Sequence, residues 1–277
     1  MNLIIKSWSG RMGNNIIQLI NALKFSIYYK INLIYPKHKC LKTTKLIFSN
    51  SNEDNIDINI YDKKNFTRIS DIEFDNKLLK KNNIKIDINT IKKKFQNFHE
   101  IKMNLNKIFL IQSKTQLKED VLVIYIRSGD LFDEMNVHPK YISAPLYYYE
   151  TIINKYKSKY KKYILVAEDT KNPVIKELLK KYPFIEHKIN SLKDDLEIIL
   201  SASHIVSCIG TFVTSLSWIS NNMKKVYLPD FVGKRNYFPT IEVEKINLNS
   251  EKNNYINSMG NWKNTEIQRK LLLNYKP

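Results

Sequence analysis

Short apolar runs alternate with helix-like segments between residues 121 and 228, and this alternation constrains the fold more than any other feature. The run at 121–126 is continuously apolar, which is typical of a strand buried on both faces of a parallel sheet. The remaining strands are expected at 163–166, 184–187, 204–206 and 226–228, and the helices at 145–156, 173–181, 194–201 and 214–220. Strands that alternate with helices in this way predict a doubly wound α/β sheet.

A second α/β unit is expected at the amino terminus. An apolar run at 3–5 leads into a turn that contains Gly10 and Gly13, and apolar residues then recur at helical spacing. Another apolar run at 31–35 follows, so the order is strand, glycine turn, helix, strand. Residues 37–118 are rich in lysine and asparagine and reveal no strand order.

The sequence therefore predicts two α/β lobes that face each other across a cleft. We expect an N-terminal lobe at 1–118, a Rossmann-like lobe at 119–250 and a C-terminal helical tail at 251–277. In such sheets ligands bind beyond the carboxyl ends of the strands. Polar residues at those ends are therefore the candidates for a functional site.

The formal net charge is +18, but the distribution of the lysines argues against a nucleic-acid partner. They are spread along the chain and do not alternate with aromatic residues as a base-stacking surface requires. A basic surface suits anionic polysaccharide or lipid-linked acceptors instead, with peripheral membrane contact. No apolar run approaches the roughly 20 residues of a membrane helix. Two cysteines, Cys40 and Cys208, suit a reducing, cytoplasmic setting.

The segment 125–130, Tyr-Ile-Arg-Ser-Gly-Asp, lies at the carboxyl end of the strand expected at 121–126 and carries groups that can bind an anion. Arg127 would project from the carboxyl end of the strand, where its planar guanidinium suits bidentate contact with a phosphate. Gly129 would let the backbone turn sharply or approach a ligand closely. The alternative is a strand-end turn in which Arg127 only pairs with Asp130 at the surface.

Two glycine- or hydroxyl-rich segments also follow expected strands. In 10–18, Gly-Arg-Met-Gly-Asn-Asn-Ile-Ile-Gln, backbone N–H groups could bind an anion or a sugar, or Asn14 could simply cap a helix. In 207–217, hydroxyl groups at a helix start could hold a diphosphate, or Thr211 or Thr214 could be ordinary caps.

An acidic pair ends the next strand, and metal ligands are not evident. Glu168 and Asp169 could accept hydrogen bonds from a ribose or a base, or could cap the following helix. The histidines are scattered, and no spacing of cysteine and histidine resembles a zinc site. We therefore expect no metal and no cofactor.

Together these segments resemble the fucosyltransferase superfamily that forms α-1,2, α-1,6 and protein O-linked fucose bonds. Segment 125–130 is similar to its His-x-Arg-Arg-Gly-Asp motif. The first, essential arginine of that motif, which contacts the β-phosphate of the donor, falls on Arg127. Tyr125 and Ser128 replace the histidine and the second arginine.

The resemblance extends over about residues 10–220. Segment 10–18 is similar to the superfamily's Gly-x-Leu-Gly-Asn-Gln-x-x-Gln segment, with Met12 for leucine and Asn15 for glutamine. Segment 166–169 resembles its strand-end acidic segment. Residues from 194 onward, beginning with Asp-Asp-Leu, resemble its third conserved block, in which the hydroxyl-rich turn would hold the diphosphate.

The resemblance implies a GT-B-like fold and an inverting, metal-independent glycosyltransferase. The expected donor is GDP-fucose, and the expected acceptor is a hydroxyl of a glycan or lipid-linked glycan. The expected donor-binding residues are Gly13, Asn14, Arg127, Ser128, Asp169, Thr211, Phe212, Val213, Thr214 and Ser215. The expected catalytic residues are Arg127, which would stabilise the departing diphosphate, and Asp130, Glu134 and His138, which are candidates for the base.

Two alternatives remain open at this point. The same fold could use another nucleotide sugar such as GDP-mannose, because the motif has lost its histidine and second arginine. A different class, a non-catalytic basic module that binds polysaccharide or nucleic acid, would also explain the charge. Donor hydrolysis or transfer separates an enzyme from such a module, and a steep loss of nucleic-acid affinity with salt would identify the module.

Overall fold

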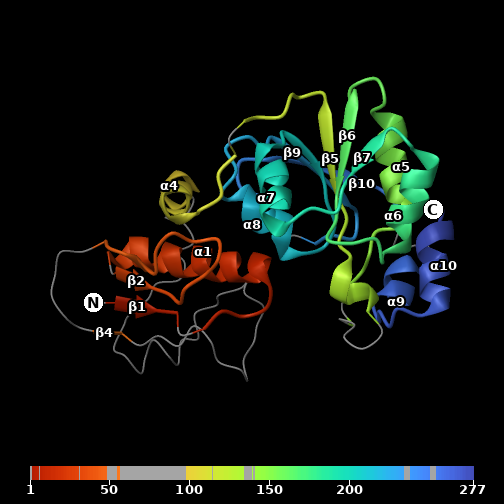
Figure 1. The fold of residues 1–277 in the computed structure, drawn as a ribbon. Helices are drawn as coiled ribbons and strands as arrows, with labels where there is room; N and C mark the ends of the chain where they lie inside the picture. Colours follow the sequence, from red (N-terminus) through yellow and green to blue (C-terminus); the bar gives the residue numbers. More distant parts are fainter. Residues whose placement is uncertain are drawn as a thin grey trace. The chain divides into compact units, whose positions relative to one another are not determined.

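The computed structural model contains two compact units, each described below by itself (Figure 1). The first unit comprises Met1–Gln112 with Thr214–Ile219, and the second comprises Ser113–Val213 with Ser220–Pro277. The structure describes residues 2–5, 7–30, 32–48, 55–56, 98–113, 115–133, 139, 141–233, 238–249 and 254–277. The boundary between the units thus falls before Ser113 rather than after residue 118.

The first unit is built on a four-stranded sheet in the order β3-β2-β1-β4. Its elements are β1 (Asn2–Ile4), α1 (Met12–Tyr29), β2 (Asn32–Ile34), β3 (Lys45–Leu46), β4 (Asn55–Ile56) and α4 (Phe98–Ile108). Strand β1 pairs in parallel with β2 and β4, and β3 pairs antiparallel to β2. The apolar face of α1 is buried, including Ile16, Leu19 and Leu23. The predicted strand, turn, helix, strand order is therefore confirmed.

The second unit is built on a six-stranded sheet in which every pairing is parallel. Its elements are β5 (Val121–Tyr125), the 3-10 helix η1 (Gly129–Phe132), α5 (Leu146–Lys155), β6 (Lys162–Val166), α6 (Pro173–Lys181), β7 (Ile185–His187), α7 (Leu192–Ser201), β8 (His204–Val206), β9 (Lys225–Pro229), β10 (Glu242–Ile246), α9 (Tyr255–Met259) and α10 (Glu266–Asn274). Helix α8 (Thr211–Ser217) begins in this unit, and its residues from Thr214 onward belong to the first unit. This confirms the predicted α/β fold with a doubly wound sheet.

The strand order β10-β9-β8-β5-β6-β7 reverses direction between β5 and β8. From β5 the chain winds outward through β6 to β7, then returns to β8 beside β5 and winds the other way. This is the order of the dinucleotide-binding doubly wound sheet, in which a crevice opens at the carboxyl ends of the strands where the order reverses. The carboxyl ends of β5 and β8 are therefore the place to look for a ligand site.

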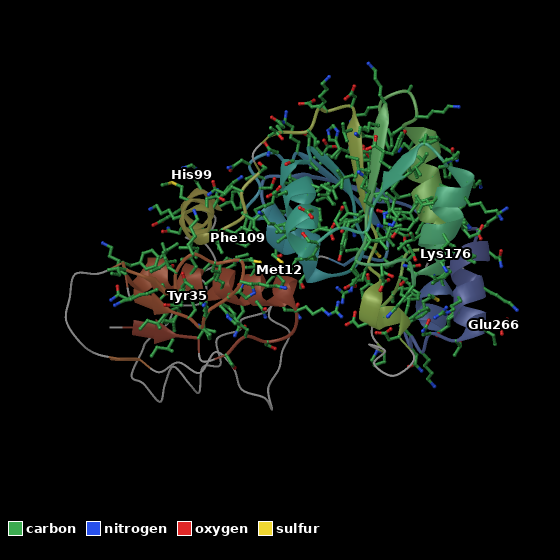
Figure 2. All side chains as sticks on the ribbon, viewed as in Figure 1. Met12, Tyr35, His99, Phe109, Lys176 and Glu266 are labelled. Atoms are coloured by element: carbon green, nitrogen blue, oxygen red, sulfur yellow. The ribbon has the colours of Figure 1, made fainter. Side chains whose placement is uncertain are left out.

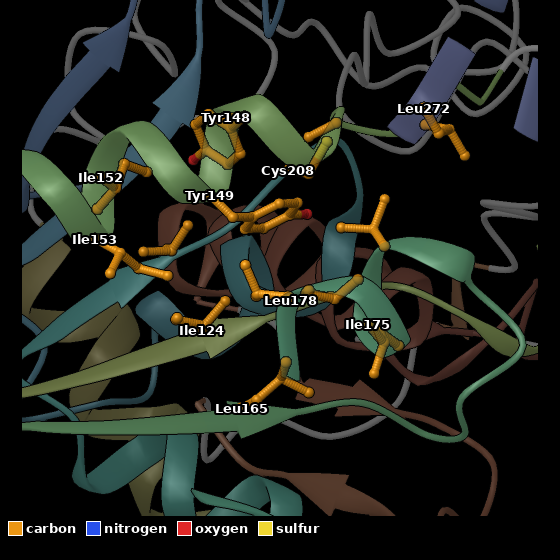
Figure 3. Packing of buried hydrophobic residues seen from close by; sticks show 14 of the residues in the cluster. Ile124, Tyr148, Tyr149, Ile152, Ile153, Leu165, Ile175, Leu178, Cys208 and Leu272 are labelled. Carbon is orange, nitrogen blue, oxygen red and sulfur yellow. The ribbon is translucent and has the colours of Figure 1, made fainter. Parts of the chain in front are cut away.

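Helices cover both faces of the second sheet, with α5 and α6 on one face and α7 on the other (Figure 1). Figure 3 shows the packing on the first face, where Tyr149 and Ile152 of α5 and Leu178 of α6 meet Ile124 and Leu165 of the strands. Several tyrosines of this core retain hydrogen bonds, because a buried hydroxyl without a partner is costly, whereas the buried hydroxyl of Tyr163 has no partner among the described residues. Tyr148, for example, donates to the carbonyls of Ser207 and Tyr227 at 2.8 Å.

The C-terminal helices are an integral part of the second unit rather than a separate tail. Leu272 of α10 and Trp262 belong to the same buried cluster as α5 and α6. The indole N–H of Trp262 donates to the carbonyl of Leu131 in η1 at 2.7 Å, and its ring lies 5.3 Å from that of Phe132. In the part of the chain that the structure describes, no helix has the length and apolar character needed to cross a bilayer.

Candidate functional site

Arg127 leaves the carboxyl end of β5 at the reversal of strand order, with its guanidinium held between two carboxylates. Its Nη2 lies 2.6 Å from Oδ1 of Asp130, and its Nη1 lies 3.7 Å from Oε1 of Glu168. The side chain retains 21% exposure, so part of the guanidinium can meet a ligand. Arg127 therefore pairs with Asp130, as one interpretation expected. It also lies at the end of the strand, where the other interpretation expected an anion-binding arginine.

The charge of Arg127 is secured by its surroundings. Burial alone would lower the pKa of Arg127, but Tyr125, Glu168 and Asp130 outweigh this and raise the pKa above its usual value. Burial raises the pKa of the Tyr125 phenol to about 12, an effect that Arg127 partly opposes. A neutral phenol and a permanent cation therefore stand side by side at this strand end.

A network of short polar contacts fixes the backbone from which Arg127 projects. Ser128 Oγ donates to Oδ1 of Asp169 at 2.5 Å and accepts from the backbone N–H of Asn172 at 3.0 Å. The N–H of Gly129 also points to Asp169, at 3.3 Å. The side-chain amide of Asn172 donates to the carbonyl of Arg127 at 3.0 Å. We call these residues, Ser128, Gly129, Asp169 and Asn172, the strand-end clamp.

The clamp holds an ionised carboxylate. Burial alone would raise the pKa of Asp169, but the bonds from Ser128, Lys171 and Gly129 outweigh it and lower the pKa below its usual range. The N–H of Lys171 donates to Asp169 at 3.0 Å, and its ammonium group contacts Asp133. Ser128 is fully buried. Ser128 and Asp169 thus support the backbone of the site, and direct contact of either with a donor stays a prediction.

Glycine is required in the clamp because of the conformation at position 129. Gly129 has a φ of +61°, a region that side chains rarely adopt. A Cβ there would lie 2.3 Å from Oε1 of Glu168. The carboxylate beside Arg127 can therefore lie directly over the turn only because the side chain is absent.

Asn172 is the residue of the clamp that sequence reasoning missed, and its substitution gives a first prediction. It is buried, it caps α6 by accepting from the N–H of Val174 at 3.0 Å, and it bonds the carbonyl of Arg127. In Asn172→Ser the hydroxyl can still cap α6 but cannot also reach Arg127. We expect donor affinity to fall about two- to tenfold, the equivalent of losing one net hydrogen bond of about 0.5–1.5 kcal/mol.

The control for this variant is a cap of another helix in the same unit. Thr265 caps α10 by accepting from the N–H of Gln268 at 3.3 Å. Thr265→Ala should lower the free energy of unfolding by about 1 kcal/mol and leave donor affinity unchanged. Calorimetric titration with nucleotide would check both variants, and equal donor affinity in Asn172→Ser and the wild type would contradict a positioning role for Asn172.

The other strand end at the reversal, that of β8, leads through a glycine turn into α8. Helix α8 begins at Thr211, so the helix predicted at 214–220 starts earlier than expected. Thr211 and Phe212 are half-buried, and the Phe212 ring lies 5.1 Å from that of Tyr125. The two aromatic rings thus join the ends of β5 and β8.

The remaining residues predicted in this segment are buried. Val213 is 2% exposed, Thr214 is 6% exposed and Ser215 is fully buried. Thr214 and Ser215 are counted with the first unit. Within the predicted diphosphate turn, Thr211 and Phe212 are therefore the residues that present surface beside β5.

A buried carboxyl group lies near the same edge, at the start of α7. Asp195 is 6% exposed and accepts from Nδ2 of Asn190 at 3.3 Å. Burial raises the pKa of Asp195 to about 6, with an opposing effect from the hydrogen bond of Asn190 and a further contribution from the charge of Asp194.

The raised pKa of Asp195 gives a second prediction, for stability against pH. Because the folded chain binds this proton more tightly than the unfolded chain, protonation favours the fold, and that contribution is lost as the pH rises through about 6. The free energy of unfolding should therefore fall by about 1–2 kcal/mol more between pH 5 and pH 8 in the wild type than in Asp195→Asn. Urea unfolding at the two pH values checks this, and parallel profiles would contradict it.

The remaining predicted site residues lie elsewhere. Gly13 and Asn14 belong to the first unit, inside the first turn of α1, which begins at Met12 with Arg11 as its cap. The proposed cap at Asn14 is therefore wrong. Glu134 and His138 lie outside the described residues. Within the described ranges, no three histidine, cysteine, aspartate or glutamate side chains are grouped as metal ligands would be.

Among the comparisons with known proteins, matches come from solved structures alone. No family model and no curated protein matches the chain. Among solved structures, "E. coli heptosyltransferase WaaC with ADP" matches 52% of this chain and 46% of its own, with 13% identity and a TM-score of 0.34. This chain thus spans less than half of that protein.

A second solved structure is "NodZ alpha-1,6-fucosyltransferase soaked with GDP-fucose". It matches 83% of this chain and 95% of its own, with 10% identity and a TM-score of 0.43.

Proposed function

We propose that this protein is an inverting glycosyltransferase that uses a nucleotide-diphosphate sugar, with GDP-fucose as donor. The observation that carries the proposal is the position of Arg127, a partly exposed cation at the carboxyl end of β5 where the strand order reverses. Doubly wound sheets bind nucleotides at this point. The motif around Arg127 supports fucose as the sugar through its resemblance to the fucosyltransferase motif.

In this proposal Arg127 binds the diphosphate and stabilises it as it departs. An oxygen of the acceptor hydroxyl attacks the anomeric carbon, and the bond from that carbon to the diphosphate oxygen breaks, with its electron pair leaving on the diphosphate. The charge that builds on the diphosphate meets a guanidinium already oriented by Asp130 and Glu168. Such preorganised charge stabilises the transition state without reorganisation during the reaction, and no metal is needed for it.

The nucleobase is the second element of the proposal. Guanine presents two adjacent N–H donors on one edge, and a carboxylate accepts such a pair well. Asp195 is a buried carboxyl group in the first turn of α7, a helix that follows β7 and so begins at the carboxyl edge of the same sheet. We assign guanine recognition to Asp195 in its ionised form, which supports GDP over ADP, UDP or CMP.

The proton of the acceptor hydroxyl must pass to a base, and the candidates are Asp130, Glu134 and His138. Oδ1 of Asp130 accepts a 2.6 Å hydrogen bond from Arg127, so this carboxylate serves first to orient the guanidinium. We therefore propose Glu134 or His138 as the base and a glycan hydroxyl as the acceptor. Substituting each with alanine tests this, and full turnover in a variant would remove that residue.

The test is a donor assay with purified protein, GDP-fucose, GDP-mannose, UDP-glucose and ADP-heptose, each with a mixture of glycan acceptors. We expect release of GDP and a fucosylated product from GDP-fucose alone. The configuration at the anomeric carbon of the product, read by NMR, should be opposite to that of the donor. Transfer from GDP-mannose instead would keep the reaction class and correct the sugar, and no turnover with any donor would contradict the proposal.

A further inference from the structure

The first unit carries an aromatic cluster at the carboxyl edge of its own sheet. Trp8 follows β1, and Tyr35 and His38 follow β2. Because β1 and β2 are parallel, the segments after them emerge at the same edge. Figure 2 labels Tyr35 in this unit. The cluster belongs to no part of the donor site described above.

The indole of Trp8 is fixed in orientation while part of its surface stays exposed. Its Nε1 donates to the carbonyls of Pro36 and Lys37, both at 3.2 Å. The ring centre lies 5.4 Å from the His38 ring in an edge-on arrangement and 6.2 Å from the Tyr35 ring. A partly exposed aromatic ring that needs no further hydrogen bond is free to offer its apolar surface to a ligand.

Two buried amide side chains of α1 hold the loop that carries Trp8. Gln18 donates to the carbonyl of Ser7 at 3.1 Å and accepts from the N–H of Ser9 at 3.2 Å. Asn15 donates to the carbonyl of Ser9 at 2.8 Å. These residues are 3% and 6% exposed, respectively. Their bonds bracket Trp8, so its ring is presented by a loop already in one conformation, which lowers the entropic cost of binding.

We propose that Trp8, with His38 beside it, is a stacking platform for a pyranose ring of a glycan. One face of a pyranose is largely apolar C–H surface while its edge carries hydroxyl groups, so such a ring matches an exposed indole bordered by polar groups. The inference names a subsite for the glycan acceptor of the proposed function, and so deepens that proposal. It concerns the first unit alone.

The imidazole of His38 supplies the polar border. Burial and the charge of Lys39 lower the pKa of His38, so the ring is neutral at neutral pH. Its Nδ1 accepts from the N–H of Cys40 at 3.2 Å. The neutral ring then carries its proton on Nε2, which can donate to a sugar hydroxyl.

Tryptophan fluorescence tests the platform selectively. The other two tryptophans, Trp218 and Trp262, are 4% and 1% exposed, so quenching by acrylamide reports mainly on Trp8. We expect at least one of cellotriose, chitotriose, maltotriose and N-acetyllactosamine, at millimolar concentration, to protect the fluorescence from acrylamide. Failure of every one of these glycans to protect it would overturn the proposal.

Two variants separate stacking from a structural role. Trp8→Phe removes the bonds to Pro36 and Lys37 but keeps an aromatic ring, whereas Trp8→Leu removes both. By calorimetry, we expect Trp8→Leu to weaken binding of the protecting glycan about tenfold and Trp8→Phe to weaken it less. Equal losses in both variants would assign the effect to the lost bonds and overturn the stacking role.

The outcome is separable from that of the proposed function. GDP binding should be unchanged in both Trp8 variants, and far-UV circular dichroism with cooperative urea unfolding checks that they are folded. If GDP does not bind the wild type but a glycan still protects Trp8, the donor assignment fails and the platform stands. If GDP binds the wild type and no glycan protects Trp8, the donor assignment stands and the platform fails.

Discussion

Replacing Arg127 with alanine is expected to lower kcat/KM for sugar transfer by about 10²–10³-fold, the usual effect of removing one preorganised donor from a developing negative charge. The variant also leaves Asp130 and Glu168 without the cation that lies between them. With Arg127 gone, the charge of the two carboxylates would repel an incoming diphosphate, so donor KM should rise as kcat falls. Steady-state kinetics with GDP-fucose measures both constants.

Two further variants serve as controls for Arg127→Ala. Arg127→Lys keeps the charge but loses the planar fork, and we expect it to recover only part of the activity. Lys270→Ala removes another cation of the second unit, one that pairs with Glu266 at 2.8 Å within α10, and should leave kcat/KM nearly unchanged. Wild-type kinetics in Arg127→Ala would remove this residue from the mechanism.

Replacing Trp262 with alanine should have the largest effect on stability. The side chain is 1% exposed, packs against Phe132 and donates to the carbonyl of Leu131. Truncating a buried tryptophan typically lowers the free energy of unfolding by about 3–5 kcal/mol, because it leaves a cavity and here also an unpaired carbonyl. Urea unfolding followed by far-UV circular dichroism measures the change.

The conservative variant divides that effect into its parts. Trp262→Phe keeps much of the packing and loses only the bond to Leu131, so it should cost about 1–3 kcal/mol. Because Leu131 lies in η1, which begins at Gly129 of the strand-end clamp, both variants should also weaken nucleotide binding. A loss below about 1 kcal/mol in Trp262→Ala would mean that the C-terminal segment does not support the unit as described.

The elements of the second sheet could be predicted from the sequence because their patterns are local. The helix at 173–181 and the strand at 204–206 have the expected boundaries, since a proline starts that helix and an apolar run marks the strand. Strand β10 was missed because its sequence, Glu-Val-Glu-Lys-Ile, is mostly polar and pairs only at the sheet edge. The packing of α10 against α5 and α6 is a tertiary contact that no local pattern records.

The candidate site could be predicted only in part, because some of its hydrogen bonds join residues that are far apart in the sequence. Arg127 stands out because an apolar strand ends in a charged group beside a glycine. Asn172 follows β6 rather than β5, so its bond to the carbonyl of Arg127 depends on the pairing of the two strands. The proline directly after Asn172 indicates that Asn172 caps a helix, and this is the one sequence feature that points to Asn172. No pattern in the sequence indicates that the buried Ser128 side chain donates a hydrogen bond to Asp169.

If Arg127 binds the diphosphate of a guanosine nucleotide, GDP should raise the thermal stability of the protein. GDP, UDP, ADP and CMP would each be added to wild type, Arg127→Ala and Asp195→Asn without metal. A ligand that binds only the folded chain raises the unfolding temperature according to its occupancy. We predict a rise with GDP alone, lost in Arg127→Ala and reduced in Asp195→Asn. No rise with any nucleotide at millimolar concentration, or a rise that survives in Arg127→Ala, would contradict the account.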